Sequence, residues 1–222
     1  MTFAVAFEFK PRAAEVYLDR ADRIRSELAA VDGFISNSLY RSLERAGWMV
    51  SLSIWRNEKA AVRWRTNATH YRMQEEARVV VLNDYRIRAG HILKDSELGV
   101  PTGTPDPFPE DDPGALTIIT AKRPNQWTET SNAADCAECL SLNPYAAGMQ
   151  AWDLLEDIAA AGNLLLLMTW DTTDAAVEFE RHVDLRDGVE LHRLRVERDY
   201  GMFERDQAPQ YLPEARLGTD CD

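Results

Sequence analysis

One segment of the chain carries residues with the types and spacing that proton transfer requires. His70 follows Trp64 and Asn67, and Tyr71 and Gln74 come within the next four residues. An imidazole titrates near neutral pH and is well suited to general base catalysis. Amides and phenols can donate hydrogen bonds to a developing oxyanion, and an indole can form an aromatic wall. His70 is therefore the candidate base, with Asn67 as a second catalytic residue and Trp64, Tyr71 and Gln74 as substrate-binding residues.

Arg88 is a third catalytic candidate, because its guanidinium could face a substrate phenolate. Structural roles compete with these functional ones: an arginine on a strand is usually solvated or paired, Trp64 would suit a core, and His70 could be a partly exposed helical residue. The four histidines are scattered and lack the spacing of a helical metal pair, which predicts no bound metal. Cys136 and Cys139 have redox spacing, but without a second cysteine pair they are interpreted as small helical residues.

The elements that must position these residues occur twice. Adding 115 to the residue number superimposes residues 33–85 on residues 148–200 without a gap. Glycines, tryptophans and an Ala-Ala-Val run coincide, as do Arg78 with Arg193 and the Asp-Tyr pairs at 84–85 and 199–200. This colinearity predicts an internal duplication of one small α+β unit.

Each copy is predicted to have the order βαββαβ, the ferredoxin-like arrangement. In the first copy, apolar runs and alternation predict strands at residues 3–9, 34–43, 48–55 and 84–93. Helical spacing predicts helices around residues 17–28, 58–64 and 69–81. The second copy is expected to repeat this pattern, with a helix over 125–142 and a last strand around Tyr200. A sheet covered by helices on one face leaves the other bare, so the two units should pack their sheets together.

The chain is thus divided into four parts: a first unit at 1–95, a Pro-rich acidic linker at 96–114, a second unit at 115–205 and a C-terminal extension at 206–222. The prolines of the linker favour an extended tether. Aromatic residues and prolines near the start of the extension indicate an ordered segment that could close a pocket.

The net charge of −12 argues against nucleic acid as a partner, because phosphate binding requires an excess of clustered Lys and Arg. The N-terminus lacks a secretory pattern, and the longest apolar run, residues 164–168, is too short to cross a bilayer. We expect a cytoplasmic protein without membrane contact.

The chain resembles the antibiotic biosynthesis monooxygenase-like proteins, which are dimeric α+β barrels built from ferredoxin-like units. The segment that carries the resemblance contains Trp55-Arg56-Asn57-Glu58-Lys59-Ala60, Trp64-Arg65, His70, Gln74, Arg78 and Asp84-Tyr85-Arg86-Ile87-Arg88. The resemblance implies tandem ferredoxin-like units that form an intrachain pseudo-dimeric α+β barrel, and it leaves a further homodimer open. It also implies a cofactor-independent monooxygenase of secondary metabolism, which oxidises a small apolar, aromatic or polycyclic substrate with O2.

Two other functions fit the same residues. One is a haem-binding or haem-degrading protein with His70 as axial ligand, and the other is a non-catalytic barrel that binds a ligand. By the 115-residue alignment, Leu185, Val189 and Phe203 replace His70, Gln74 and Arg88 in the second copy. The first copy is therefore predicted to carry the site.

Overall fold

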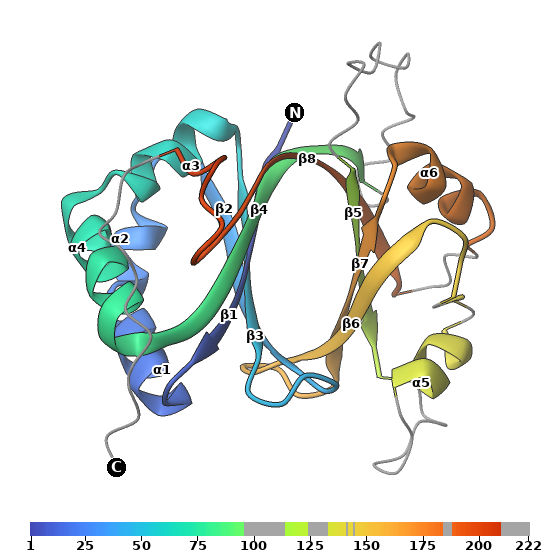
Figure 1. Ribbon diagram of the computed structural model, residues 1–222, viewed down its shortest axis with the longest axis horizontal. Helices are drawn as coiled ribbons and strands as arrows, with labels where there is room; N and C mark the ends of the chain where they lie inside the picture. The colour runs from blue at the N-terminus through green and yellow to red at the C-terminus, as the bar shows by residue number, and fades with distance from the viewer. Residues whose placement is uncertain (96–113, 124–132, 141, 144, 184–187, 210–222) are drawn as a thin grey trace.

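The computed structural model describes residues 1–95, 114–123, 133–140, 142–143, 145–183 and 188–209 (Figure 1). The first half contains β1 (Phe3–Pro11), α1 (Ala14–Arg23), α2 (Arg25–Ala29), β2 (Phe34–Ser42), β3 (Met49–Trp55), α3 (Glu58–Arg65), α4 (Ala68–Glu76), the π-helix η1 (Ala77–Val81) and β4 (Leu82–Asp95). The second half contains β5 (Ala115–Lys122), α5 (Ala133–Cys139), β6 (Met149–Asp157), β7 (Asn163–Trp170), α6 (Thr173–Arg181) and β8 (Glu190–Gly201).

The strands form a closed antiparallel barrel in the order β1-β3-β2-β6-β7-β5-β8-β4. Each half contributes four neighbouring strands, and the pairs β2–β6 and β4–β8 join the halves at two seams. The helices of the first half lie on one outer side of the barrel and those of the second half on the other (Figure 1). This confirms the predicted α+β barrel. None of the helices described is long and apolar enough to cross a membrane.

Alternation along the strands separates the barrel interior from two outer layers beneath the helices. The interior is an apolar cluster drawn from all eight strands: Ala4, Ala6, Tyr40, Val50, Leu52, Ile92, Leu116, Ile118, Leu155, Leu165, Leu167, Leu194 and Val196. Residues of the opposite parity, such as Phe3, Trp55 and Ala89, pack with Trp64 of α3 instead. A residue's position in its strand therefore determines whether it faces the barrel interior or the helices.

The 115-residue relationship holds from the second strand to the following helix of each half. Gly33 and Gly148 have φ angles of +89° and +80°, a conformation that favours glycine. A Cβ on Gly33 would lie 2.8 Å from the Cβ of Ala60, and one on Gly148 would lie 2.6 Å from the Cβ of Ala175. The same close approach of helix to turn is built twice.

The relationship fails in the last strand, which corrects the alignment of the two copies. Phe3 pairs with both Trp55 and His91, whereas Ala115 pairs with Trp170 and Arg195. The strand registers therefore equate His91 with Arg195, an offset of 104 instead of 115. The connection after α6 is shorter, and α4 and η1 have no counterpart among the described residues of the second half.

Several expected equivalences change as a result. Asp199 and Tyr200 lie near the end of β8, whereas Asp84 and Tyr85 lie near the start of β4. Phe203 follows β8 and is not the counterpart of Arg88, whose register position is occupied by His192. Val189 precedes β8 and is not helical, and Leu185 lies outside the described residues.

The end of β8 and the residues that follow it cover part of the first unit. Register shifts in the β4–β8 pair bring β8 so close to Gly90 that a Cβ there would lie 1.7 Å from the carbonyl oxygen of Arg195. Met202 then packs beside Phe9 and Met49 with 2% exposure, and its amide donates to the carbonyl of Tyr85 at 2.9 Å. The segment that directly follows β8 is thus part of the first unit's core. Most of the predicted linker and of residues 206–222 lies outside the described residues.

Candidate functional site

The α3–α4 corner of the first unit positions the candidate base. Asn67 is the N-cap of α4, and its side-chain oxygen accepts hydrogen bonds from the amides of Thr69 at 2.9 Å and His70 at 3.1 Å. This cap fixes the start of the helix that carries His70. The structure therefore gives Asn67 a positioning contact, and its amide oxygen is already occupied.

His70 is stacked on Trp64, with the ring centroids 4.2 Å apart and the planes at 14°. Its Nδ1 lies 3.0 Å from the carbonyl oxygen of Trp64 and 3.0 Å from Nε2 of Gln74. A carbonyl oxygen only accepts, so a hydrogen bond to it requires the proton on Nδ1; in that tautomer the lone pair is on Nε2, and the Gln74 amide nitrogen, which only donates, contacts Nδ1 without a hydrogen bond. Nε2 has no partner among the described residues and is the atom that can accept a substrate proton.

Burial lowers the pKa of His70 from 6.5 to about 4, against the opposing effect of its hydrogen bond to the Trp64 carbonyl. The imidazole is therefore neutral at pH 7 and ready to accept a proton. It is also a weak base, so the anion left on a substrate would need stabilisation by nearby positive charge.

The other predicted residues are placed differently. Gln74 contacts His70 as expected and donates to the carbonyl of Arg65 at 3.2 Å. Tyr71 is partly buried, but the contacts of the His70 ring do not include it. Adjacent helical residues point in different directions, which accounts for this separation.

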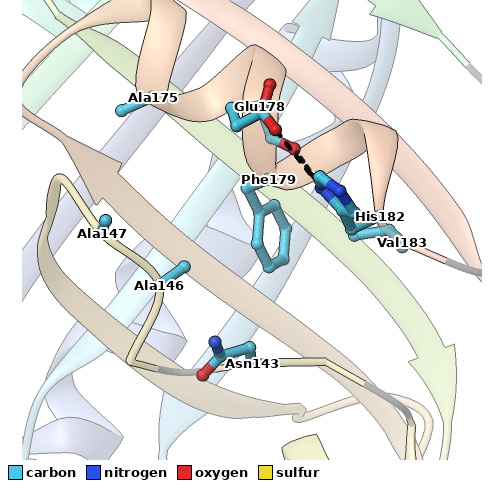
Figure 2. A pocket seen from close by; sticks show the side chains of 8 residues that line it. All are labelled: Asn143, Ala146, Ala147, Ala175, Glu178, Phe179, His182 and Val183. Atoms are coloured by element: carbon cyan, nitrogen blue, oxygen red, sulfur yellow. Dashed lines mark hydrogen bonds and ion pairs between the residues drawn. The ribbon is translucent and has the colours of Figure 1, made fainter.

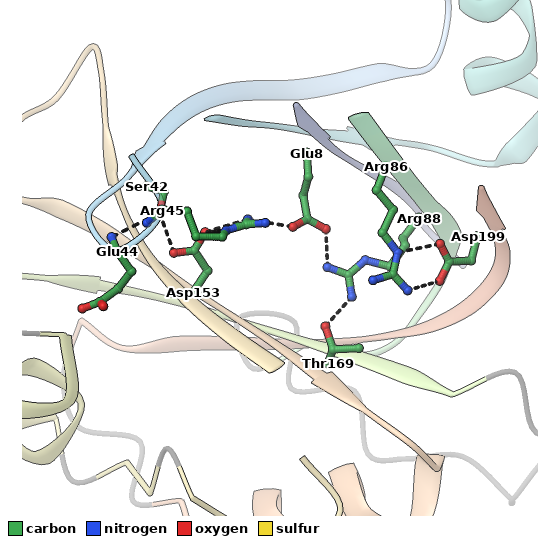
Figure 3. Close-up of polar contacts among 9 residues, drawn as sticks. All are labelled: Glu8, Ser42, Glu44, Arg45, Arg86, Arg88, Asp153, Thr169 and Asp199. Atoms are coloured by element: carbon green, nitrogen blue, oxygen red, sulfur yellow. Dashed lines mark hydrogen bonds and ion pairs between the residues drawn. The ribbon is translucent and has the colours of Figure 1, made fainter. Parts of the chain in front are cut away.

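Arg88 does not share a site with His70, because it faces the barrel interior (Figure 3). It donates to Glu8 and to Thr169 of the second half, and Glu8 also accepts from Arg45 at 2.8 Å. Arg45 in turn binds Asp153 of the second half at 2.8 Å. The expectation that Arg88 faces the His70 pocket is therefore corrected: strand alternation directs it to a polar network that links the halves. Burial would raise the pKa of Glu8, but the charges of Arg88 and Arg45 lower it below its ordinary value.

A cluster of arginines and tyrosines on the helical side of the first unit was not predicted from the sequence. Arg78, 2% exposed, donates to the hydroxyl of Tyr85, and Arg205 donates to the same hydroxyl at 2.8 Å. The guanidinium carbon of Arg205 also lies 5.9 Å from the ring centre of Tyr200. Arg78 lies in the π-helix η1, a geometry that is frequent at functional sites.

The second unit contains a groove of about 240 Å³ beside α6 (Figure 2). Phe179 lies on one side, and Ala146 and Asn143 lie on the other. Val31 and Ala146 are equivalent positions, because the carbonyl of each accepts a hydrogen bond from the first residue of the strand that follows. Ala146 and Phe179 of the second unit are smaller than their first-unit equivalents Val31 and Trp64, which accounts for the open space. His182 at the rim is 74% exposed and contacts Glu178. The imidazole at this groove is exposed, whereas that of His70 in the first unit is partly buried.

No group of three or more His, Cys, Asp or Glu side chains in the described ranges is arranged to hold a metal ion. Cys136 is buried and forms no disulfide, as expected for a small core residue. The possible redox partner Cys139 has no described side chain.

Comparisons with known proteins agree with this architecture. The family model described as Antibiotic biosynthesis monooxygenase matches residues 1–76. Jasmonate monooxygenase ABM from Pyricularia oryzae is 38% identical over 222 residues, which cover 96% of this chain and 99% of that protein. The names of the family and of this relative support a monooxygenase-type function.

Solved structures show the same fold at low identity. A crystal structure of aldoxime dehydratase has a TM-score of 0.52 and 12% identity, covering 88% of this chain and 80% of its own. Aldoxime dehydratase OxdRE in complex with butyraldoxime has a TM-score of 0.51 and 12% identity, with coverages of 88% and 79%. At this identity the likeness concerns the fold alone.

Proposed function

Because the chain belongs to the antibiotic biosynthesis monooxygenase family, we propose that it is a cofactor-independent monooxygenase whose site lies at the α3–α4 corner of the first unit. The observation that supports this most directly is His70: a neutral imidazole, held through Nδ1 by the Trp64 carbonyl, with Nε2 available. The substrate we propose is a small organic molecule, aromatic or polycyclic as in secondary metabolism. The name of the Pyricularia oryzae relative makes jasmonate the first compound to assay.

In the proposed reaction, Nε2 of His70 accepts a proton from an acidic position of the substrate. The resulting anion reduces O2, a new C–O bond forms at the same carbon, and loss of water converts a CH2 group to C=O. The balance is CH2 plus O2 to C=O plus H2O, so the substrate supplies all the electrons. Trp64 excludes water from one face of the imidazole, and the guanidinium groups on this side of the unit offset the weak basicity of His70.

Oxygen consumption tests the proposal directly. The wild type and His70→Ala are assayed with jasmonate and a panel of anthrones and phenols, with His182→Ala as the matched control in the second unit. Loss of a general base is expected to lower turnover by roughly 10²–10⁴-fold. The control should retain full activity, because the His182 side chain is 74% exposed and distant in the fold from α4. Full activity in His70→Ala would remove the proposed base.

A haem-binding function is the second candidate, and the same observation favours it. Axial histidines are commonly oriented by a hydrogen bond from the other ring nitrogen, and a neutral imidazole is the form that ligates metal. Titration with haemin should then give a Soret shift that His70→Ala loses. A ligand-binding barrel without catalysis would instead bind compounds from the panel and consume no O2.

A further inference from the structure

The last turns of α3 and α6 carry opposite charges at equivalent positions. Asn57 caps α3 and Thr172 caps α6, and these residues are 115 apart. Arg65 therefore occupies the position of Glu180. Glu180 is 7% exposed and accepts a hydrogen bond at 2.8 Å from Arg193 of β8. In the second unit this position is an acid whose charge is neutralised inside the protein.

The first unit has neither half of that ion pair. The strand registers place Ala89 where Arg193 stands in the second unit, so the base of the pair is also absent. Arg65 is partly buried, its Nε is inaccessible to solvent, and that nitrogen has no hydrogen-bond partner. Within the described ranges, the guanidinium of Arg65 makes no hydrogen bond or ion pair. A buried donor without a partner is costly, which indicates that something else binds it.

Arg65 lies within electrostatic range of Tyr200, whose ring is also contacted by a second cation, Arg205. Burial raises the pKa of Tyr200, and the charges of Arg65 and Arg205 oppose that effect, so both cations act on the same hydroxyl. Arg205 lies against the Tyr200 ring and bonds Tyr85. Asp199, next to Tyr200, is already bound by Arg86 at 2.8 Å. The local charge around Arg65 therefore favours an anion.

Arg65 also belongs to the corner that holds His70. Its backbone carbonyl accepts a hydrogen bond from Gln74, which also contacts Nδ1 of His70. We propose that Arg65 binds the carboxylate of an organic acid whose apolar body lies against Trp64 and His70. A guanidinium suits this role because its planar donors match the two oxygens of a carboxylate. This inference rests on the proposed function, because it identifies the substrate of the same site as an organic acid.

The test compares two probes that share one apolar body, naphthalene-1-acetate and its methyl ester, in which an added methyl group removes the negative charge. Binding of each is measured by calorimetry at neutral pH to the wild type, Arg65→Leu, Arg65→Lys and Arg72→Leu. Arg72 is the matched control, an exposed arginine on α4. The wild type and Arg72→Leu are expected to prefer the acid by about tenfold or more, the usual contribution of a hydrogen bond between charged groups. Arg65→Leu should bind both probes equally, and Arg65→Lys should keep part of the preference.

Thermal melts separate binding from a structural role. Because Arg65 has no internal partner, Arg65→Leu should melt at or above the wild-type temperature. Equal binding of both probes by the wild type, a preference that survives in Arg65→Leu, or a large fall in its melting temperature would each overturn the proposal. None of these measurements involves O2, so a failure of His70 as a base would leave them intact and would count against the proposed function alone.

Discussion

His70 should make the stability of the protein sensitive to acid, and His70→Phe should remove that sensitivity. Phenylalanine keeps a ring that can stack on Trp64 but cannot bind a proton. The pKa of His70 in the folded protein, about 4, lies below its unfolded value of 6.5. As pH falls from 6.5 towards 4, the unfolded chain therefore takes up a proton that the folded chain does not, and stability is lost.

The size of this effect follows from the same displacement. One pKa unit corresponds to about 1.4 kcal/mol, so lowering the pKa from 6.5 to about 4 makes the loss about 3 kcal/mol. At pH 7 the wild type should be more stable than His70→Phe by about 1 kcal/mol, the usual contribution of the hydrogen bond to Trp64 that the variant lacks. At pH 4 the order should reverse, with the variant more stable by about 2 kcal/mol.

Urea unfolding followed by circular dichroism, repeated between about pH 4 and 7.5, measures both proteins on one scale. Carboxylates such as Glu8 titrate in both proteins and cancel in the difference. Parallel pH profiles for the two proteins would refute the reasoning, because they would show that the imidazole titrates alike in the folded and unfolded chains.

Three further substitutions test the fold that supports the site. Arg88→Leu leaves the buried Glu8 with one cation and should lower the free energy of unfolding by roughly 3–5 kcal/mol in urea titrations, whereas adding Glu8→Gln should restore part of the loss. Gly90→Ala places a Cβ on a backbone carbonyl of β8, so a loss of roughly 4 kcal/mol or a failure to accumulate soluble protein is expected; a wild-type melt would contradict the register of the seam. Met202→Ala should cost roughly 2–5 kcal/mol and its neighbour Phe203→Ala less than about 0.5, because Met202 is 2% and Phe203 53% exposed; equal costs would show that the segment after β8 is not part of the core.

Much of the fold could be predicted from local sequence patterns. Apolar runs and alternation located the first three strands of each half. Glycine recurs at positions 33 and 148 because each of these turns approaches the equivalent helix of its own half, α3 or α6. The last strand of the second half was predicted around Tyr200, which does lie in β8, but the strand was aligned wrongly with β4 because an Asp-Tyr pair at 199–200 matched the one at 84–85. Two matching residues are weaker evidence than a full strand register, which becomes visible only when the partner strand is known.

The site was predicted in part, for reasons that differ by residue. His70 and Gln74 meet because they are four residues apart on α4, whereas Trp64 of α3 meets the His70 ring across the corner between the two helices. Arg88 was grouped with His70 although the twofold period of a strand separates it from Ile87 and Ala89, which lie on the helical side. The contact of Tyr85 with Arg205 spans 120 residues and depends on the path of the chain after β8, for which no local pattern exists.

The two seams of the barrel have a consequence for synthesis on the ribosome. When the first unit emerges, β2 and β4 present unpaired edges, because their partners β6 and β8 have not yet been made. Exposed edges of this kind pair readily with other chains. The nascent first half must therefore be protected from aggregation until β6 and β8 have been translated, and Arg205 emerges after both. Activity of the first unit should appear only after β8 has been translated and paired with β4.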